Sequence, residues 1–207
     1  MLKEIKIELT NKCSRNCKHC SSSATSDTKH LKELDFSNVY ELIKQAKDMN
    51  VETVVFTGGE PLMYDRLDEL VKLTKDLGMK STIYTFAYRN IENLNKYRIL
   101  IENGLDKIIY SLADTLSDKE DTSTYNKEEF FDKVFEKGNA TLGFHYAVSK
   151  DSIDRLNEVV NSTIEIFDNK TLWTNALIKE GWFEFRYIID EDDFTPSETF
   201  AKYEDYQ

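Results

Sequence analysis

All three cysteines of the 207-residue chain lie within eight residues, in the segment TNKCSRNCKHCSSS. Their spacing is Cys13-x3-Cys17-x2-Cys20, and lysine and arginine residues are interspersed among them. Nearby positive charge lowers the pKa of a thiol and favours the thiolate, which is the form that binds metal. Three cysteines are too few for a disulfide scaffold, and an odd number cannot pair completely. The segment therefore predicts a metal site with Cys13, Cys17 and Cys20 as ligands.

The spacing of the cysteines does not by itself decide which kind of site they form. Positions 13, 17 and 20 could share one face of a helix, but nothing else on that face is apolar. A structural zinc ion needs a fourth protein ligand, and neither His19 nor His30 stands at a common zinc-finger spacing. A cubane iron–sulfur cluster normally takes four thiolates, so three would leave one iron open to a substrate or cofactor. The spacing favours the cluster over zinc.

A glycine-rich turn, Phe56-Thr57-Gly58-Gly59-Glu60-Pro61, is the second segment that could carry chemistry. Two adjacent glycines let a ligand approach the backbone closely. A carboxylate beside them can pair with an ammonium group. Considered by itself, the segment is better explained as a glycine turn with proline at the start of a helix.

The elements that must position these segments alternate between strand and helix patterns. Apolar residues at helical spacing predict helices that begin near Asp35, Asp65, Asn90 and Asp151, a shorter one over 130–135, and a short helix at about 171–180. Runs rich in β-branched and aromatic residues predict strands at 4–10, 52–57, 80–87, 107–112, 141–148 and 182–189. Such alternation implies a parallel sheet, either doubly wound or an incomplete barrel. In both folds, function belongs at the carboxyl ends of the strands.

Composition excludes several classes of protein. The net charge of −11 argues against a duplex nucleic-acid binder. No apolar run exceeds three residues, so we expect no membrane-spanning helix, which needs about 20. The first residues also lack the apolar stretch of a secretory signal, and a cytoplasmic location is expected.

The negative charge is concentrated at the end of the chain. From residue 190 onward there are seven acidic residues and one lysine, a net charge of −6. Most such tails are solvated. We therefore expect a core domain at residues 1–189 and an acidic tail at residues 190–207.

Together, ELTNKCSRNCKHCSSS and FTGGEPLMYDRL resemble the first two β-α units of the radical S-adenosylmethionine (SAM) superfamily. The resemblance implies an α/β fold, a partial barrel of six parallel β-α units with outer helices. It implies that Cys13, Cys17 and Cys20 bind one [4Fe-4S] cluster, whose fourth iron is chelated by SAM. It also implies that Gly58, Gly59 and Glu60 hold the amino end of the methionine moiety.

Further SAM-binding residues follow from the same resemblance. His19 stands where the family usually has an aromatic residue whose backbone lies near adenine. Thr85 ends the third strand, but the run Thr85-Phe86-Ala87 lacks the asparagine that is usual there. Strand alternation would point Arg186 into the barrel, with a surface ion pair as the alternative. Ser111 and Asp114 flank the end of the fourth strand, where the family often has a polar residue near SAM.

The implied chemistry is that of an oxygen-sensitive oxidoreductase. A reduced cluster donates one electron to SAM, the C5′–S bond breaks, and the resulting 5′-deoxyadenosyl radical abstracts hydrogen from a substrate. A low-potential donor such as flavodoxin or ferredoxin is implied as a partner. No further cysteine is present for an auxiliary cluster.

The substrate is not specified by these motifs. Little chain follows the sixth strand, so the barrel is expected to be open on one side, which suits a peptide or protein. The alternatives are a small molecule or nucleotide, or activation of a glycyl-radical enzyme. A non-catalytic iron–sulfur or zinc protein is the hypothesis from another class. The intact Gly58-Gly59-Glu60 favours the enzyme, because a purely structural site needs no SAM cradle.

Overall fold

The computed structural model describes residues 2–15, 20, 22, 24–111, 124–136, 138, 140–148 and 183–187. Within them a single parallel sheet has the strand order β1-β2-β3-β4-β5-β6. The strands are β1 (Glu4–Thr10), β2 (Thr53–Gly58), β3 (Lys80–Thr85), β4 (Lys107–Ser111), β5 (Thr141–Val148) and β6 (Phe183–Tyr187). All six predicted strands are therefore confirmed, although β3 ends two residues earlier than predicted.

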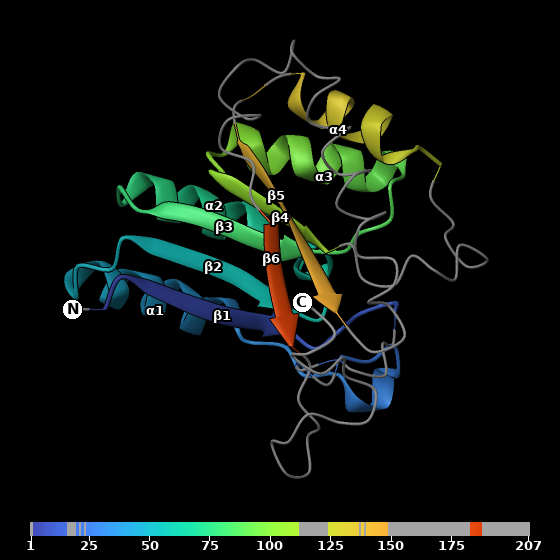
Figure 1. Cartoon of the computed structure of the whole chain (residues 1–207). Helices are drawn as coiled ribbons and strands as arrows, with labels where there is room; N and C mark the ends of the chain where they lie inside the picture. Colours follow the sequence, from blue (N-terminus) through green and yellow to red (C-terminus); the bar gives the residue numbers. More distant parts are fainter. Residues whose placement is uncertain are drawn as a thin grey trace.

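Helices follow the strands along the outer side of the sheet (Figure 1). They are α1 (Phe36–Asp48), α2 (Leu67–Asp76), α3 (Ile91–Glu102) and α4 (Lys127–Phe135), with short 3-10 helices η1 (Thr28–His30) and η2 (Pro61–Met63). Asp35 and Asn90 cap α1 and α3 as predicted: Asp35 accepts two backbone N–H bonds and Asn90 accepts one. The residues Asp151 and 171–180 lie outside the described part of the chain.

The helix predicted to begin near Asp65 is present, but Asp65 does not cap it. The chain after Glu60 first forms η2, and α2 begins only at Leu67, with Arg66 at its cap position and no capping side chain. Arg66 instead pairs with Glu69, at 2.6 Å between Nε and Oε1. This ion pair lies on the first turn of α2.

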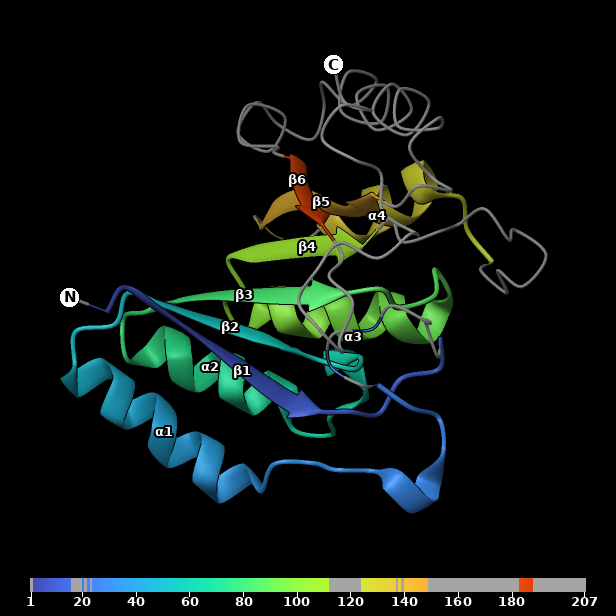
Figure 2. The same cartoon turned by 60° about the horizontal axis from the view of Figure 1, so that its bottom comes forward.

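The strand order distinguishes the two folds that periodicity left open. A doubly wound sheet reverses its strand order at a switch point, whereas here each strand is hydrogen-bonded to the next one along the chain without a reversal. Figure 2 shows the resulting curved sheet, with the helices on its convex side. The arrangement is an incomplete barrel, as the resemblance implied.

The core lies between the convex face of the sheet and the helices. Leu9, Phe56, Ile83, Ile108 and Phe144 are completely buried and come from five successive strands. Helices α1 to α4 contribute residues at helical spacing, among them Ile43, Leu70, Tyr97 and Phe131. This continuous apolar layer holds the strands in register, so that their carboxyl ends meet at one edge.

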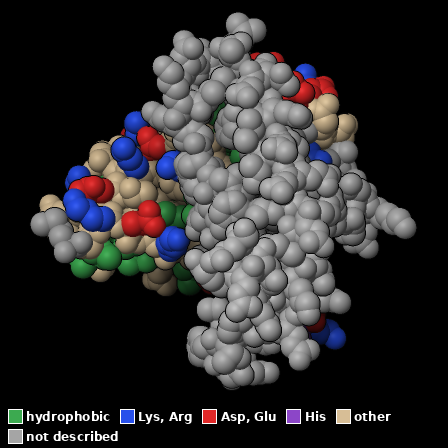
Figure 3. All heavy atoms as spheres, viewed as in Figure 1, with side chains coloured by type: hydrophobic (Ala, Val, Ile, Leu, Met, Phe, Trp, Pro, Cys, Tyr) green, Lys and Arg blue, Asp and Glu red, His purple; other side chains and the backbone are tan. Residues whose placement is uncertain are grey.

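The opposite, concave face carries polar side chains. Lys6 and Glu8 alternate along β1 with the buried Ile7 and Leu9, and both charged side chains are exposed. On the face shown in Figure 3, basic and acidic side chains of the described residues lie close to one another. No helix in the described part of the chain is long and apolar enough to cross a membrane.

Candidate functional site

The carboxyl ends of β1, β2 and β3 bring the cysteine segment, the glycine turn and Thr85 to one edge of the sheet. The glycine turn continues the pairing beyond the end of β1. The N–H of Gly59 donates to the carbonyl of Thr10 at 2.6 Å, and the N–H of Glu60 donates to the carbonyl of Lys12 at 2.8 Å. Lys12 directly precedes Cys13, so the two chemistry-bearing segments are joined through their backbones.

The close backbone contact between the glycine turn and the cysteine segment explains why both turn residues are glycines. A Cβ on Gly59 would lie 2.3 Å from the carbonyl oxygen of Lys12, and one on Gly58 would lie 2.3 Å from that of Thr10. Gly58 also has a φ of +130°, which disfavours any side chain. The sequence predicted close approach by a ligand. In the structure the group in closest approach is the chain's own cysteine segment.

Glu60 is buried, with 6% of its surface exposed, and its carboxylate accepts three hydrogen bonds. Oε1 accepts from the hydroxyl of Thr85 at 2.7 Å and from the N–H of Leu62 at 3.1 Å, while Oε2 accepts from the N–H of Phe86 at 2.8 Å. Burial raises the pKa of Glu60 above its ordinary value, and these bonds oppose that rise. The carboxylate therefore ties the turn after β2 to the end of β3.

These protein partners come in addition to the ammonium partner expected for Glu60 from its sequence context. The partners described for its carboxylate are groups of the protein, two of them at the end of β3. An ionised carboxylate has about four lone-pair positions, so these three bonds do not exhaust its capacity. Its role toward SAM stays a prediction.

Thr85 is buried and links Glu60 to Tyr97 of α3. Its Oγ1 lies 3.1 Å from the Tyr97 hydroxyl and accepts from the N–H of Ala87 at 3.2 Å. Burial raises the pKa of Tyr97 well above its ordinary value, so its hydroxyl stays protonated and can donate. Sequence reasoning missed this role because Tyr97 fits the apolar stripe of its helix, and nothing in the spacing distinguishes it.

The cysteine segment is an extended loop where it is described. Lys12 and Thr25 form a bridge, and the N–H of Cys13 donates to the carbonyl of Thr25 at 3.0 Å. Residues 13–15 are described and are not helical, so they lend no support to a buried cysteine helix. Cys13 is buried and Cys20 is half-buried.

The two described cysteines fit metal-bound thiolates. The N–H of Arg15 donates to Sγ of Cys13 at 3.5 Å, and the N–H of Ala24 donates to Sγ of Cys20 at 3.4 Å. Hydrogen bonds from N–H groups to sulfur stabilise the negative charge of a cluster's ligands and tune its reduction potential. The donor set therefore suits an iron–sulfur cluster.

The structure describes only some of the other predicted site residues. Among the described residues no three histidines, cysteines or acids converge on a metal site, and Cys17, His19 and Asp114 lie outside them. His30 is exposed, and its Nδ1 lies 2.9 Å from Oδ2 of Asp27. Ser111 ends β4 as predicted and pairs in register with His145 of β5. The backbone of Arg186 lies in β6, but its side chain is outside the described part.

The concave face carries a row of side chains that was not predicted, and it begins at Lys6 in the middle of β1. Nζ of Lys6 lies 5.2 Å from the ring centre of Tyr84. The ring of Tyr84 meets that of His145 edge-on, at 6.2 Å between centres. Lys6, Tyr84 and His145 come from β1, β3 and β5, so the row runs across the sheet.

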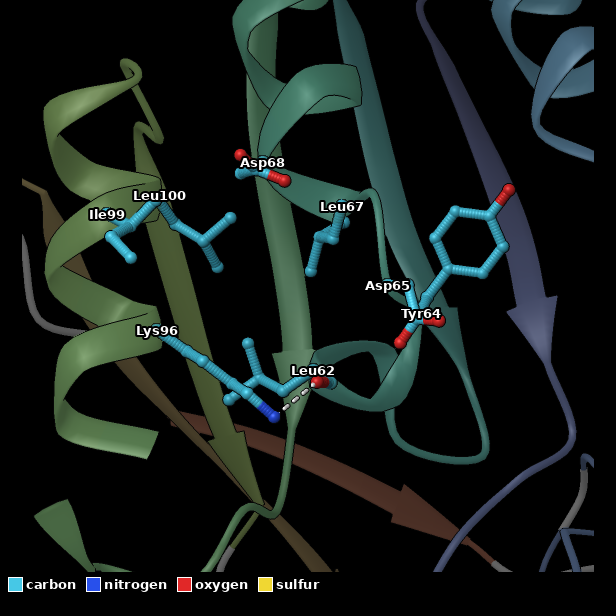
Figure 4. Close-up of a pocket in the computed structure, with 8 residues that line it drawn as sticks. All are labelled: Leu62, Tyr64, Asp65, Leu67, Asp68, Lys96, Ile99 and Leu100. Carbon is cyan, nitrogen blue, oxygen red and sulfur yellow. Dashed lines mark hydrogen bonds between the residues drawn. The ribbon is translucent and has the colours of Figure 1, made fainter. Parts of the chain in front are cut away.

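A cavity of about 240 Å³ lies elsewhere, between η2, α2 and α3 (Figure 4). Nζ of Lys96 reaches across it to the carbonyl oxygen of Leu62 at 3.2 Å. The lining residues are Leu62, Tyr64, Asp65, Leu67, Asp68, Lys96, Ile99 and Leu100. None of them is a predicted site residue, so this cavity on the helical side is not the candidate site.

The chain is similar in sequence to a known protein family and to several curated proteins. The model of the radical SAM superfamily matches residues 7–166. A GTP 3′,8-cyclase of Campylobacter fetus subsp. fetus is 26% identical over 187 residues, 89% of this chain and 54% of that protein. A probable GTP 3′,8-cyclase of Methanocella arvoryzae is 25% identical over 77% of this chain and 53% of that protein. The chain thus spans about half the length of these curated relatives.

Solved structures share the fold. Streptococcus suis SuiB bound to S-adenosylmethionine superposes with a TM-score of 0.69 at 20% identity, over 97% of this chain and 44% of SuiB. HydG, a maturase of the [FeFe]-hydrogenase, has a TM-score of 0.67 at 13% identity, over 99% of this chain and 48% of HydG. At these identities the likeness establishes the partial-barrel fold alone.

Proposed function

The chain belongs to the radical SAM superfamily, and we propose that it binds one [4Fe-4S] cluster through Cys13, Cys17 and Cys20 and cleaves SAM beside it. When bound, the cluster and SAM supply a one-electron cleavage that generates a 5′-deoxyadenosyl radical able to take hydrogen from a substrate. The observation that carries the proposal is the backbone join between Thr10–Lys12 and Gly59–Glu60. It supports a single site built from the cysteine segment and the glycine turn.

The chain's own residues hold and orient the reacting groups. Backbone N–H groups on the sulfurs of Cys13 and Cys20 stabilise the thiolates that bind metal. Gly58, Gly59 and Glu60 would hold the amino end of SAM, and the Thr85 hydroxyl fixes the Glu60 carboxylate in place. Orientation of this kind accounts for a large part of catalysis when a cofactor carries the chemistry. The partner would be a low-potential electron donor such as flavodoxin or ferredoxin.

Anaerobic SAM cleavage tests this proposal. The full chain is reconstituted with iron and sulfide, and SAM and dithionite are added without substrate. We expect 5′-deoxyadenosine, measured by mass spectrometry, from the wild type and none from Cys17→Ala, which lacks one cluster ligand. A wild-type protein that carries a complete cluster and forms no deoxyadenosine, even with added nucleotides or peptides, would favour a non-catalytic iron–sulfur protein.

For the substrate, we propose a small anionic molecule of the nucleotide class. The open barrel expected from the sequence favours a peptide or protein. The curated relatives, named GTP 3′,8-cyclases, support a nucleotide instead. The ammonium group of Lys6 beside the Tyr84 ring also supports it, because a cation and an aromatic ring suit a phosphate and a base.

Lys6→Met is expected to weaken binding of GTP about fivefold or more, because the variant removes a cation from the concave face. The matched control is Lys80→Met, which removes an exposed cation at the amino end of β3. Calorimetry on the reconstituted protein with bound SAM provides the measurement. Equal GTP affinity in the two variants would argue against this site, and deoxyadenosine formation stimulated by peptides but not by nucleotides would restore the peptide hypothesis.

A further inference from the structure

Phe86 contacts the cysteine segment and the glycine turn at the same time. Its backbone N–H donates to Oε2 of Glu60 at 2.8 Å, which fixes the residue just beyond the end of β3. The guanidinium of Arg15 stacks on the Phe86 ring, with its Cζ 3.4 Å from the ring centre. The ring also lies 6.0 Å, between centres, from those of Tyr88 and Tyr110. Phe86 is therefore held in place by the barrel, and its ring contacts Arg15 of the cysteine segment.

Arg15 lies where its contact with Phe86 can restrain the backbone next to Cys13. It lies midway between Cys13 and Cys17 in the sequence, and its backbone N–H already donates to Sγ of Cys13. A separation of 3.4 Å is face-to-face contact, and a planar guanidinium stacks on an aromatic ring better than an ammonium group does. The stack thus fixes a side chain of the loop whose backbone presents an N–H to a ligand sulfur.

We propose that Arg15 and Phe86 form a clasp that positions the cysteine segment and holds a permanent positive charge beside the cluster. Both are positioning residues, and the inference rests on the proposed cluster site. Two consequences follow. The clasp restrains the loop before any cluster is bound. Once a cluster is present, the guanidinium charge stabilises its more negative, reduced state, so the clasp raises the reduction potential.

The chain contains a matched control for this arrangement. Arg66 stacks on Phe36 with Cζ 3.3 Å from the ring centre, so it has the same type of contact and the same charge. That pair joins the first turns of α1 and α2 instead of the cysteine segment. Arg66→Gln therefore removes an equivalent stack without touching the loop.

The test compares Arg15→Gln, Phe86→Leu and Arg66→Gln as full chains. The first readout, made before reconstitution, is amide hydrogen exchange at Cys13 and Thr25, whose N–H groups hold the loop together. We expect faster exchange in Arg15→Gln and Phe86→Leu, and wild-type exchange in Arg66→Gln. Thermal unfolding of each variant distinguishes a local effect on the loop from a loss of the whole fold.

The second readout is made on the reconstituted proteins. Arg15→Gln is expected to shift the reduction potential of the cluster to a more negative value and to weaken SAM binding about three- to tenfold. Arg15→Lys keeps the charge and should keep the potential, and Phe86→Tyr keeps the ring and should keep the exchange pattern. These conservative variants test the clasp even where the larger changes impair folding.

Two outcomes would overturn the inference. One is exchange at Cys13 and Thr25 that is the same in Arg15→Gln, Phe86→Leu and Arg66→Gln. The other is a reduction potential unaffected by Arg15→Gln. Failure of the proposed function appears differently, as a wild-type protein that loads no cluster, and the exchange experiment then still decides whether the clasp restrains the loop.

Discussion

Gly59→Ala is expected to lower the rate of SAM cleavage about 100-fold, although the fold away from the site has no reason to change. The new Cβ would lie 2.3 Å from the carbonyl oxygen and 2.7 Å from the carbonyl carbon of Lys12. Both atoms belong to backbone, so no side chain can rotate away to relieve the contact. The cysteine segment must move, and a misplacement of about 1 Å at a reacting centre can cost about 100-fold in rate. Deoxyadenosine formation at matched iron content measures the loss.

Gly78→Ala is the matched control for this change. Gly78 has a φ of +71°, and its Cβ would meet only Nζ of Lys47, at 3.9 Å. Alanine there carries the cost of a left-handed backbone, about 1–2 kcal/mol of unfolding free energy, without disturbing the site. We therefore expect Gly78→Ala to be less stable and still active. Wild-type cleavage by Gly59→Ala would show that the backbone join does not position the reacting groups.

Glu60→Ala is expected to lower both stability and SAM binding. The substitution leaves the N–H groups of Leu62 and Phe86 and the Thr85 hydroxyl without the acceptor that they now share in a buried place. Each buried donor left without an acceptor costs about 1–3 kcal/mol, so the unfolding free energy should fall by about 3 kcal/mol or more. The end of β3 would also lose its connection to the glycine turn. Denaturant unfolding and SAM calorimetry measure the two effects.

Asp106→Ala provides the comparison for Glu60. The Asp106 carboxylate also accepts a backbone bond, from the N–H of Ser81 at 2.8 Å, but at the amino ends of β3 and β4. Its loss should cost about 1–3 kcal/mol and leave SAM binding unchanged. If both variants lost equal stability and both bound SAM normally, Glu60 would be a structural residue alone.

Local patterns predicted most of the sheet and several helix boundaries. The strands are short runs of β-branched and aromatic residues, and the caps at Asp35 and Asn90 depend on bonds to residues two or three positions away. Asp65 does not cap α2, because the glycine turn is followed by η2 and the helix begins two residues later, at Leu67. Asn126 caps α4 and was not predicted, although its side chain accepts from Glu129 N–H in the usual way.

The chemistry of the ligands was determined by the sequence itself. Three clustered cysteines, and a glycine turn followed by a carboxylate, specify donor groups, and the identity and spacing of donors within each segment are local properties of a chain. Six β-α repeats specify a parallel sheet for the same reason, because each pattern extends over only one element. Only the tertiary structure decided how these parts meet. The carboxylate of Glu60 accepts hydrogen bonds from Thr85 and Phe86, which lie 25 and 26 residues further along the chain, at the end of β3. Arg15 contacts Phe86 across the edge of the sheet. Such contacts arise because parallel strands in sequential order bring their carboxyl ends together, and that register is a property of the folded sheet, not of any one segment.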